Sequence, residues 1–493
     1  MSLKATVSLQ RKLNTFDVMS LVVGSIVGAD IYVAAAIGAR LVGPASLLVW
    51  IIAGAIAIVI ALSFAYCAAV RSAVGGPYAY AKEVGSPVIG FTVGWALLLA
   101  EWFSLAVFPV AFVQYSTSLF DVHGQVSETL LKSLFIMLIL ATNVVGIKAA
   151  GRFNDLLTIV KLSPLLLIIV AGLAFMIFEP GITSANFSPF MTGSTGNFGQ
   201  ALVLIFWAYA GFELSTLPAD EIDSPRRTIP KAIVTGMMIV VSFYLLTNFV
   251  IIGTVDSAKL ATSNSPLMDS ASAIFSSSSW LANLAPAIIG VGALISILGA
   301  DESGTLGTSR LAYALSLDGL LPKPLSKIHS KLGTPYVALS VLCLTAFVAS
   351  VFADLVQLIN ASVFLLSFVY FATCASAILL RKKDTHTRRI SYIIPVCGLL
   401  FSLSLMALVN IDQILVSIGL ILAGLPIYWF FSPKQELHEM KKVFLSREAV
   451  LRRAFDQGER FLAYPWRRML WLIYGQTERK KAWVLEDERR NPK

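Results

Sequence analysis

The sequence predicts an all-α polytopic membrane protein with twelve transmembrane helices. Of its 493 residues, 57% are hydrophobic and only 14% are charged, and the mean hydropathy is +0.77. A soluble domain carries about 25% charged residues, so this chain has too few charges to cover a surface that faces water. Apolar runs also fill almost the whole chain up to residue 431, and the segments between them differ sharply in basic charge.

The apolar runs have the length of membrane-spanning helices. A helix needs about 20 mostly apolar residues to cross the hydrocarbon core. Runs bounded by Gly, Pro or charged residues predict spans at 16–40, 45–70, 88–118, 133–147, 156–178, 198–219, 232–253, 284–316, 335–353, 355–380, 391–410 and 413–431. The first run has no small-residue cleavage site and a second apolar run follows it, so we expect a retained span and not a signal peptide.

Basic residues concentrate on one side of these spans. With a cytoplasmic N-terminus, nineteen Lys and Arg residues fall in inside segments and three, Arg40, Lys132 and Lys259, fall in outside segments. The positive-inside rule therefore predicts that both termini are cytoplasmic. The same rule accounts for the formal net charge of +9, so we expect no nucleic-acid partner.

The sequence gives no sign of a metal or cofactor site. Its four cysteines lie in apolar runs without CxxC spacing, and its four histidines all lie outside the middle of the spans. It contains neither an HExxH motif nor a Walker-type loop. We therefore expect no metal, no cofactor and no enzymatic activity.

The last segment, residues 432–493, is polar and basic, with 15 Lys and Arg against 9 Asp and Glu. Leu462, Trp466, Met469 and Ile473 recur in it at helical spacing, among arginines. This pattern predicts either a helix on the anionic inner leaflet or a solvated tail that packs on the cytoplasmic loops.

Two predicted spans hold glycine close to a carboxylate at mid-membrane depth. The first contains Gly24, Gly28 and Asp30, and the sixth contains Gly211 and Glu213. A charged carboxylate at that depth costs about 2.5–3.5 kcal/mol on the insertion scale, and Gly inside a helix costs about 1 kcal/mol against Ala. One Gly-x-x-x-Gly pair is equally consistent with close helix packing. Two interruptions five helices apart instead predict an inverted repeat whose unwound segments meet at the midplane.

Four blocks of the chain resemble the amino acid–polyamine–organocation (APC) superfamily of transporters. Residues 28–32 (Gly-Ala-Asp-Ile-Tyr) resemble the family's G-[SA]-G-I-F element. Residues 211–213 (Gly-Phe-Glu) with 220–230 are similar to its G-F-E…E-E-x-x-N-P-x-R-x-I-P pattern. Residues 309–322 resemble its S-R-x-x-Y-A-x-x-x-D-G-x-x-P block, and 333–335 its G-T-P.

Order and spacing agree with this superfamily over about residues 15–430. The resemblance implies the LeuT-type fold, with two inverted five-helix repeats plus two further helices, working by alternating access. It divides the chain into a cytoplasmic N-terminus (1–15), a transmembrane domain (16–431) and the tail. Within that domain, repeat one would be 16–178, repeat two 198–380 and the extra helices 391–431.

The resemblance also implies where substrate binds. The carboxylate and amine of the substrate would lie against backbone groups of the unwound parts of spans one and six. The residues expected to bind it are Ser25, Ile26, Gly28, Ala29, Asp30, Ile31, Trp207, Ala208, Tyr209, Ala210, Gly211 and Phe212. The aromatic side chains among them would wall or gate the pocket, or simply pack.

Lys161, in the fifth span, is the expected proton-coupling residue. In several proton-coupled members of the superfamily, a lysine of that span occupies the place where sodium-coupled relatives hold their ion, and a buried lysine can release its proton. The alternative is that Lys161 snorkels to the cytoplasmic face. The acids Glu101, Glu213 and Asp301, the last beside Glu302, are further candidates for proton coupling.

Asp30 departs from the superfamily, which usually has glycine at this position. A carboxylate there would repel a substrate carboxylate held by the nearby N–H groups. Asp30 would instead cap the outer half-helix, pair with a buried cation or bind a substrate ammonium. The intramembrane acids outnumber Lys161, which favours a cationic substrate or several proton sites.

These features predict a proton-coupled secondary transporter of an amino acid or related amine in the cell membrane. Its expected partners are the substrate, protons and the lipid bilayer. The alternatives are an ion-independent exchanger of amino acids or polyamines and a nutrient sensor that binds without transport. A channel would need a ring of charged or polar residues around a pore, which two broken helices do not suggest.

Overall fold

The structure, a computed structural model, describes residues 13–432 with gaps at 74, 146, 218, 220–221, 277–279, 330–331 and 384–391, and without side chains at 145, 147–157 and 382–383. The predicted tail after Ser432 lies outside the described residues. So do nearly all of the N-terminal segment 1–15 and the acidic pair 220–221 of the second family-like block.

The described residues form helices joined by short connections and contain no β-strand, only an isolated bridge between Leu13 and Ile222. The α-helices are α1 (Thr15–Ile26), α2 (Ala29–Val42), α3 (Ser46–Val70), α4 (Pro77–Val84), α5 (Pro87–Phe120), α6 (Gln125–Val145), α7 (Ile147–Phe178), α8 (Pro180–Asn186), α9 (Thr195–Phe206), α10 (Pro225–Thr254), α11 (Ser257–Thr262), α12 (Pro266–Ile274), α13 (Leu281–Leu317), α14 (Tyr336–Phe352), α15 (Leu355–Lys383), α16 (Ile393–Leu408) and α17 (Ile411–Phe431). Short 3₁₀ helices are η1 (Gly43–Ala45), η2 (Trp207–Tyr209), η3 (Phe212–Thr216) and η5 (Lys323–Ser326).

Nine helical stretches in the described part of the chain are long and apolar enough to cross a membrane. The first of them, Thr15–Val70, contains α1, α2 and α3, and two further apolar helices, α14 and α16, are shorter. Helices suit this setting because they satisfy their own backbone hydrogen bonds where no water is present. The predicted all-α, multi-pass membrane class is confirmed.

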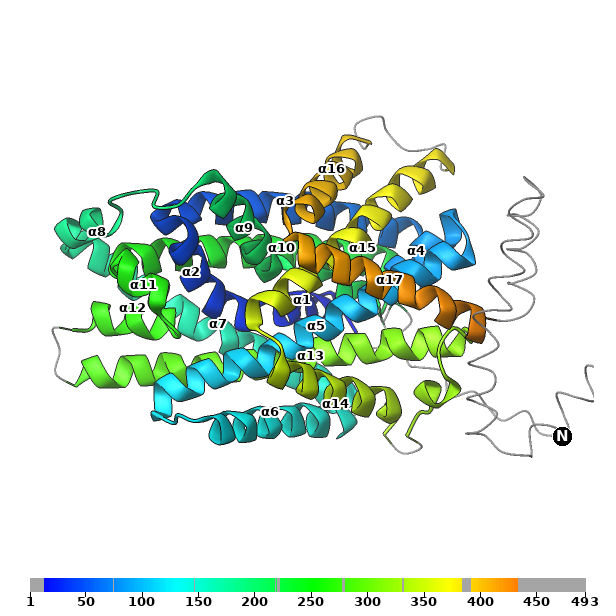
Figure 1. Ribbon diagram of the computed structural model, residues 1–493, viewed down its shortest axis with the longest axis horizontal. Coiled ribbons are helices and arrows are strands. Elements are labelled where there is room, and N and C mark those ends of the chain that lie inside the picture. The colour runs from blue at the N-terminus through cyan, green and yellow to red at the C-terminus, as the bar shows by residue number, and fades with distance from the viewer. Residues whose placement is uncertain are drawn as a thin grey trace, which may run out of the picture.

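The long helices α3, α5, α10 and α13 extend along the long axis of the molecule (Figure 1). The short helices α8, α11 and α12 gather at one end of the bundle, and α4 lies at the other. The short α1 packs against α7, α10, α13 and η3, which places the break after it in the interior of the bundle.

The predicted interruptions of the first and sixth spans are confirmed. Helix α1 ends at Ile26, Val27 and Gly28 are non-helical, and α2 begins at Ala29. A Cβ atom at Gly28 would overlap the Cβ of Ala300 in α13, so only glycine allows this close approach.

The second interruption follows α9 and η2. Here Gly211 has a φ of +121°, in the region that favours glycine, and η3 begins at the next residue. Each break spans only about two residues, so most of the backbone expected to be unwound is helical.

We predict that Gly211→Ala destabilises the protein, because Ala would have to adopt this positive φ and its Cβ would lie 3.0 Å from the Ser25 carbonyl oxygen. Strain of this kind costs about 1–3 kcal/mol. Thermal unfolding of the purified protein in detergent measures the effect. Gly419→Ala is the matched control, because Gly419 lies in α17 with no atom within 4 Å of an added Cβ. Equal unfolding temperatures for the two variants would contradict the strained geometry.

Candidate functional site

The break between α1 and α2 frees backbone carbonyl groups that a continuous helix would bond internally. Side chains of three other helices donate hydrogen bonds to these carbonyl groups, which have no water to bond within the membrane. The bonds run from Lys161 Nζ (α7) to the Gly24 oxygen at 2.7 Å, from Tyr244 Oη (α10) to the Ile26 oxygen at 3.0 Å, and from Ser296 Oγ (α13) to the Val27 oxygen at 3.3 Å. The end of α1 is thereby tied to three surrounding helices.

Both breaks use the same arrangement for their free N–H group. At each, a carboxylate two residues after the glycine accepts a hydrogen bond from the glycine N–H. The Gly28 nitrogen lies 2.9 Å from Asp30 Oδ1, and the Gly211 nitrogen lies 3.1 Å from both carboxylate oxygens of Glu213. Tyr244 also donates to Asp30 Oδ2 at 2.9 Å. Of the roles expected for Asp30, the structure therefore shows capping of the outer half-helix, and an electrostatic interaction with the buried Lys161 agrees with pairing to a cation.

The two breaks contact each other directly. Ser25, in the last turn of α1, donates from Oγ to the Gly211 carbonyl oxygen at 3.0 Å and to the Val22 oxygen at 3.1 Å. Glycine allows the backbone of each break to approach a neighbouring helix closely. A Cβ atom would collide with α13 at Gly28 and with α1 at Gly211.

A pocket lies beside the two breaks. Its lining consists of Ser25, Asp30, Glu101, Ser104, Leu105, Phe108, Trp207, Ala210, Gly211, Glu213, Leu214, Ala300, Gly304 and Leu366. Three of these residues are acids, all buried, and no Lys, Arg or His of the described chain lines the pocket. The pocket is therefore suited to a positively charged group.

Glu101, on α5, is a lining acid with an unpaired carboxyl oxygen. Its side chain is only 5% exposed, and its carboxyl group interacts directly with that of Glu213. Its Oε1 atom has no hydrogen-bond partner among the described residues. Two carboxylates this close repel each other unless a proton or a cation lies between them.

The structure separates the twelve residues expected to bind substrate into two groups. Ser25, Asp30, Trp207, Ala210 and Gly211 line the pocket. The other seven lie at or beside the breaks without lining it: Ile26, Gly28, Ala29, Ile31, Ala208, Tyr209 and Phe212.

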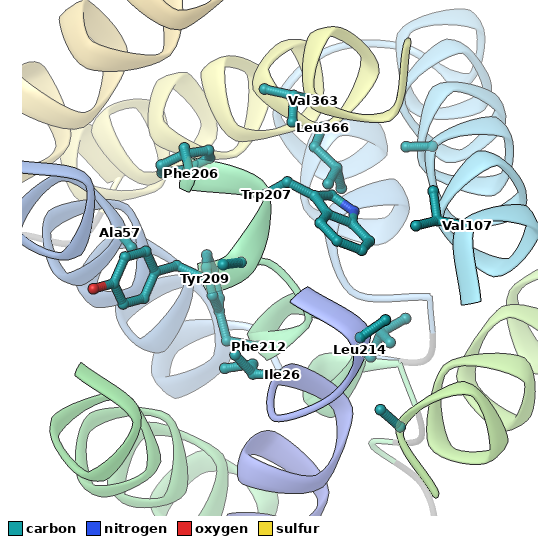
Figure 2. Close-up of a cluster of buried hydrophobic side chains, with 14 of the residues drawn as sticks. Ile26, Ala57, Val107, Phe206, Trp207, Tyr209, Phe212, Leu214, Val363 and Leu366 are labelled. Atoms are coloured by element: carbon teal, nitrogen blue, oxygen red, sulfur yellow. The ribbon is translucent and has the colours of Figure 1, made fainter. Parts of the chain in front are cut away.

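The three expected aromatic residues differ in what they contact. Trp207 lines the pocket and donates from Nε1 to Ser104 Oγ at 3.2 Å. Tyr209 points to the other side of the segment (Figure 2), where its hydroxyl donates to the Trp50 carbonyl oxygen at 3.1 Å. Phe212 stacks on Tyr370 with 5.5 Å between ring centroids. Only Trp207 is therefore placed to meet a ligand, and the other two pack.

Several lining residues were not expected from the sequence. Ser104 and Phe108 follow Glu101 by three and seven residues, so helical spacing from that acid could have found them. Ala300 and Gly304 share a face of α13 for the same reason. Leu105 also follows Glu101 at helical spacing, by four residues, whereas Leu214 and Leu366 are ordinary apolar residues that carry no such signal.

Lys161 is fully buried and bonds to Gly24, so in this structure it does not snorkel to the cytoplasmic face. Its ammonium group interacts electrostatically with Glu302 and Asp30. Asp301 lies outside the pocket, and neither of its carboxyl oxygens has a hydrogen-bond partner among the described residues. Of the expected coupling residues, Glu101 and Glu213 thus line the pocket, whereas Lys161 in α7 and Asp301 in α13 do not.

Comparison with known proteins assigns the family. The family model described as amino acid permease matches residues 13–431. The chain belongs to the amino acid permease family. The resemblance to the APC superfamily is thereby confirmed, and the protein is a permease and not an enzyme.

Three curated relatives cover most of this permease. The branched-chain amino acid permease BcaP of Bacillus subtilis is 28% identical over 87% of this chain and 94% of its own. The human cystine/glutamate transporter is 29% identical over 86% of each chain. The serine/threonine exchanger SteT of Bacillus subtilis is 24% identical over 85% of this chain and 97% of its own. The relatives thus include both transporters and exchangers of amino acids.

We predict that Tyr244→Phe destabilises the permease, because the Ile26 carbonyl and the Asp30 carboxylate lose their shared donor. Leaving a buried acceptor unsatisfied costs about 1–3 kcal/mol. Thermal unfolding in detergent checks this against Tyr66→Phe, since the Tyr66 hydroxyl has no hydrogen-bond partner among the described residues. If both variants unfold at the same temperature as the wild type, the Tyr244 hydroxyl does not stabilise the break.

Proposed function

We propose that the protein is a secondary active transporter that moves an amino acid or a related amine across the cell membrane by alternating access, coupled to protons. The observation that carries this proposal is the pocket where two broken helices meet, lined by residues of both breaks. Binding sites at discontinuous helices are a recurrent feature of secondary transporters. The permease family and the transporters and exchangers among its relatives support amino acid transport.

We further infer twelve crossings in the LeuT-type arrangement. Counting α1 with α2, and α9 with η2 and η3, as one crossing each gives twelve with α3, α5, α6, α7, α10 and α13 to α17. Repeat one would be 16–178 and repeat two 198–380, followed by the extra helices 391–431. The matched breaks support this division, because each inferred repeat begins with a helix that carries a glycine–carboxylate pair.

We place both termini in the cytoplasm and the protein in the cell membrane. Nineteen basic residues in the inside segments against three outside favour this orientation. Two of the three outside residues, Arg40 in α2 and Lys259 in α11, lie in helices at the end of the bundle opposite α4 (Figure 1). That arrangement agrees with the proposed orientation.

Lys161 is the proposed coupling residue. Its protonated side chain makes a charge-assisted hydrogen bond to the Gly24 carbonyl, which joins α7 to the last turn of α1. Loss of the proton weakens this bond and so changes the relative free energy of two arrangements of α1. A proton biases alternating access only if it binds more tightly in one arrangement of α1 than in the other.

Ion-independent exchange is the second candidate, and the exchanger among the relatives favours it. Transport that ignores an imposed pH gradient but requires substrate on the opposite side would identify an exchanger. Binding without uptake would identify a sensor. Reconstitution into proteoliposomes separates all three after a thermal-shift screen over amino acids, polyamines and small amines has found a substrate.

We predict that Lys161→Ala abolishes pH-gradient-driven uptake while leaving the protein folded. The measurement is uptake of labelled substrate into proteoliposomes with and without an imposed gradient. Lys132→Ala is the matched control, since Lys132 also bonds a backbone carbonyl, that of Ser350 at 2.6 Å, but this carbonyl lies in α14 and not at a helix break. Proton-driven uptake that persists unchanged in Lys161→Ala would remove this residue from the mechanism.

A further inference from the structure

The helix breaks hold their backbone donors in internal hydrogen bonds. N–H groups at the start of a half-helix are the natural partners of a substrate carboxylate. Here the Gly28 N–H is bonded to Asp30, and the N–H groups of Asp30 and Ile31 also interact with this carboxylate. Each donor that would receive a substrate carboxylate at α2 thus already faces a carboxylate of the protein.

The second break is occupied in the same way. The Gly211 N–H lies between the two carboxylate oxygens of Glu213, at 3.1 Å from each. A substrate carboxylate would have to displace Glu213 or Asp30 and then lie beside the displaced anion. Like charges in a buried site repel strongly because little water screens them.

The open groups of the pocket are acceptors for a cation. Glu101 lines the pocket, one of its carboxyl oxygens is buried without a hydrogen-bond partner among the described residues, and its carboxyl group interacts with that of Glu213. A buried carboxylate is stabilised by a paired cation, and an ammonium group supplies three donors. Trp207 lines the same pocket with an aromatic ring, which attracts cations at its face.

We propose that this pocket binds an organic amine without a carboxylate, held at its ammonium group by Glu101 and Glu213. The cavity, of about 20 Å³, has room for an ammonium group, so Leu105, Phe108 and Leu214, which also line it, would move apart to admit the hydrocarbon part of the amine. Asp30 contributes by occupying the N–H groups of α2, which excludes amino acids. This assignment rests on the proposed transport function and names its substrate class.

The test compares amines with the amino acids that differ from them only by a carboxylate. The pairs are cadaverine and lysine, putrescine and ornithine, agmatine and arginine, and phenylethylamine and phenylalanine. Binding to the full-length protein in lipid nanodiscs is measured by calorimetry at neutral pH. In every pair with a detectable ligand, we expect the amine to bind at least tenfold more tightly than the corresponding amino acid. Equal or tighter binding of the amino acid in those pairs would overturn the assignment.

Proteoliposome uptake separates this assignment from the transport proposal. Uptake of an amino acid with no binding of any amine would overturn the substrate class and leave transport standing. Binding of an amine without uptake of any compound would support the pocket assignment and count against transport.

Two variants locate the selectivity within the pocket. Glu101→Gln removes the charge of this carboxyl group, and we expect at least a tenfold loss of affinity for the preferred amine. Glu83→Gln is the control, because Glu83 lies on the surface near Arg71. Unchanged amine affinity in Glu101→Gln would overturn the role of that carboxylate.

Asp30→Gly restores the glycine that is usual in the superfamily and frees the Gly28 N–H. We expect the ratio of amine to amino acid affinity to fall at least tenfold, through tighter binding of the amino acid. A ratio identical to that of the wild type would show that Asp30 does not exclude the carboxylate. If Asp30→Gly does not fold, the Glu101→Gln comparison still decides the proposal.

Discussion

Hydrogen bonding of the backbone inside the membrane is the constraint on which this structure depends. No water reaches the hydrocarbon region, so every N–H and C=O group freed by a helix break must find a partner within the protein. The break after α1 finds its carbonyl partners in Lys161, Tyr244 and Ser296, which come from α7, α10 and α13. The N–H groups find theirs in Asp30 and Glu213. Three of the intramembrane charges noted in the sequence, Lys161, Asp30 and Glu213, are therefore among the residues that make the breaks possible.

This constraint connects the fold to transport. The bonds that satisfy the first break also join α1 to three neighbouring helices, and Ser25 joins it to the second break. Any movement of α1 that opens the pocket to one side must exchange these bonds for others of similar free energy. In the proposed mechanism, protonation biases this exchange through the bond of Lys161, which is titratable, whereas the bonds of Tyr244 and Ser296 respond only to geometry. The proposed substrate recognition uses the same groups, because Asp30 and Glu213, which cap the breaks, also line the pocket.

The sequence predicted the helical class and the places where the helices break. Long apolar runs predict helices, and glycine close to a carboxylate in two spans five helices apart predicted the interruptions. The pattern alone does not force a break, because α13 holds Gly299 and Asp301 and runs unbroken. Short helices such as α4 and α8 were not predicted, because they lie in the connections and are too short to give a periodic signal.

The side-chain directions around the breaks were harder to predict. Trp207 lines the pocket, whereas Tyr209 bonds the Trp50 carbonyl and Phe212 stacks on Tyr370. Nothing in the spacing of these aromatic residues reveals that difference. Tyr244 and Ser296 were not predicted either, because each is an ordinary residue of an apolar span in the sequence. Only the structure shows that each lies beside a free carbonyl. The role of Asp30 was one of three expected from its position, and the choice among them required the distance to the Gly28 nitrogen.

The central claim is that two helices break at glycine and that a nearby carboxylate caps each break. An experimental density map of the protein in lipid nanodiscs, at a resolution that shows side chains, tests it most directly. The account predicts gaps in both helices, with the carboxyl groups of Asp30 and Glu213 against the preceding glycine nitrogens. Density for two helices that run unbroken across the membrane, with these carboxyl groups directed elsewhere, would contradict it.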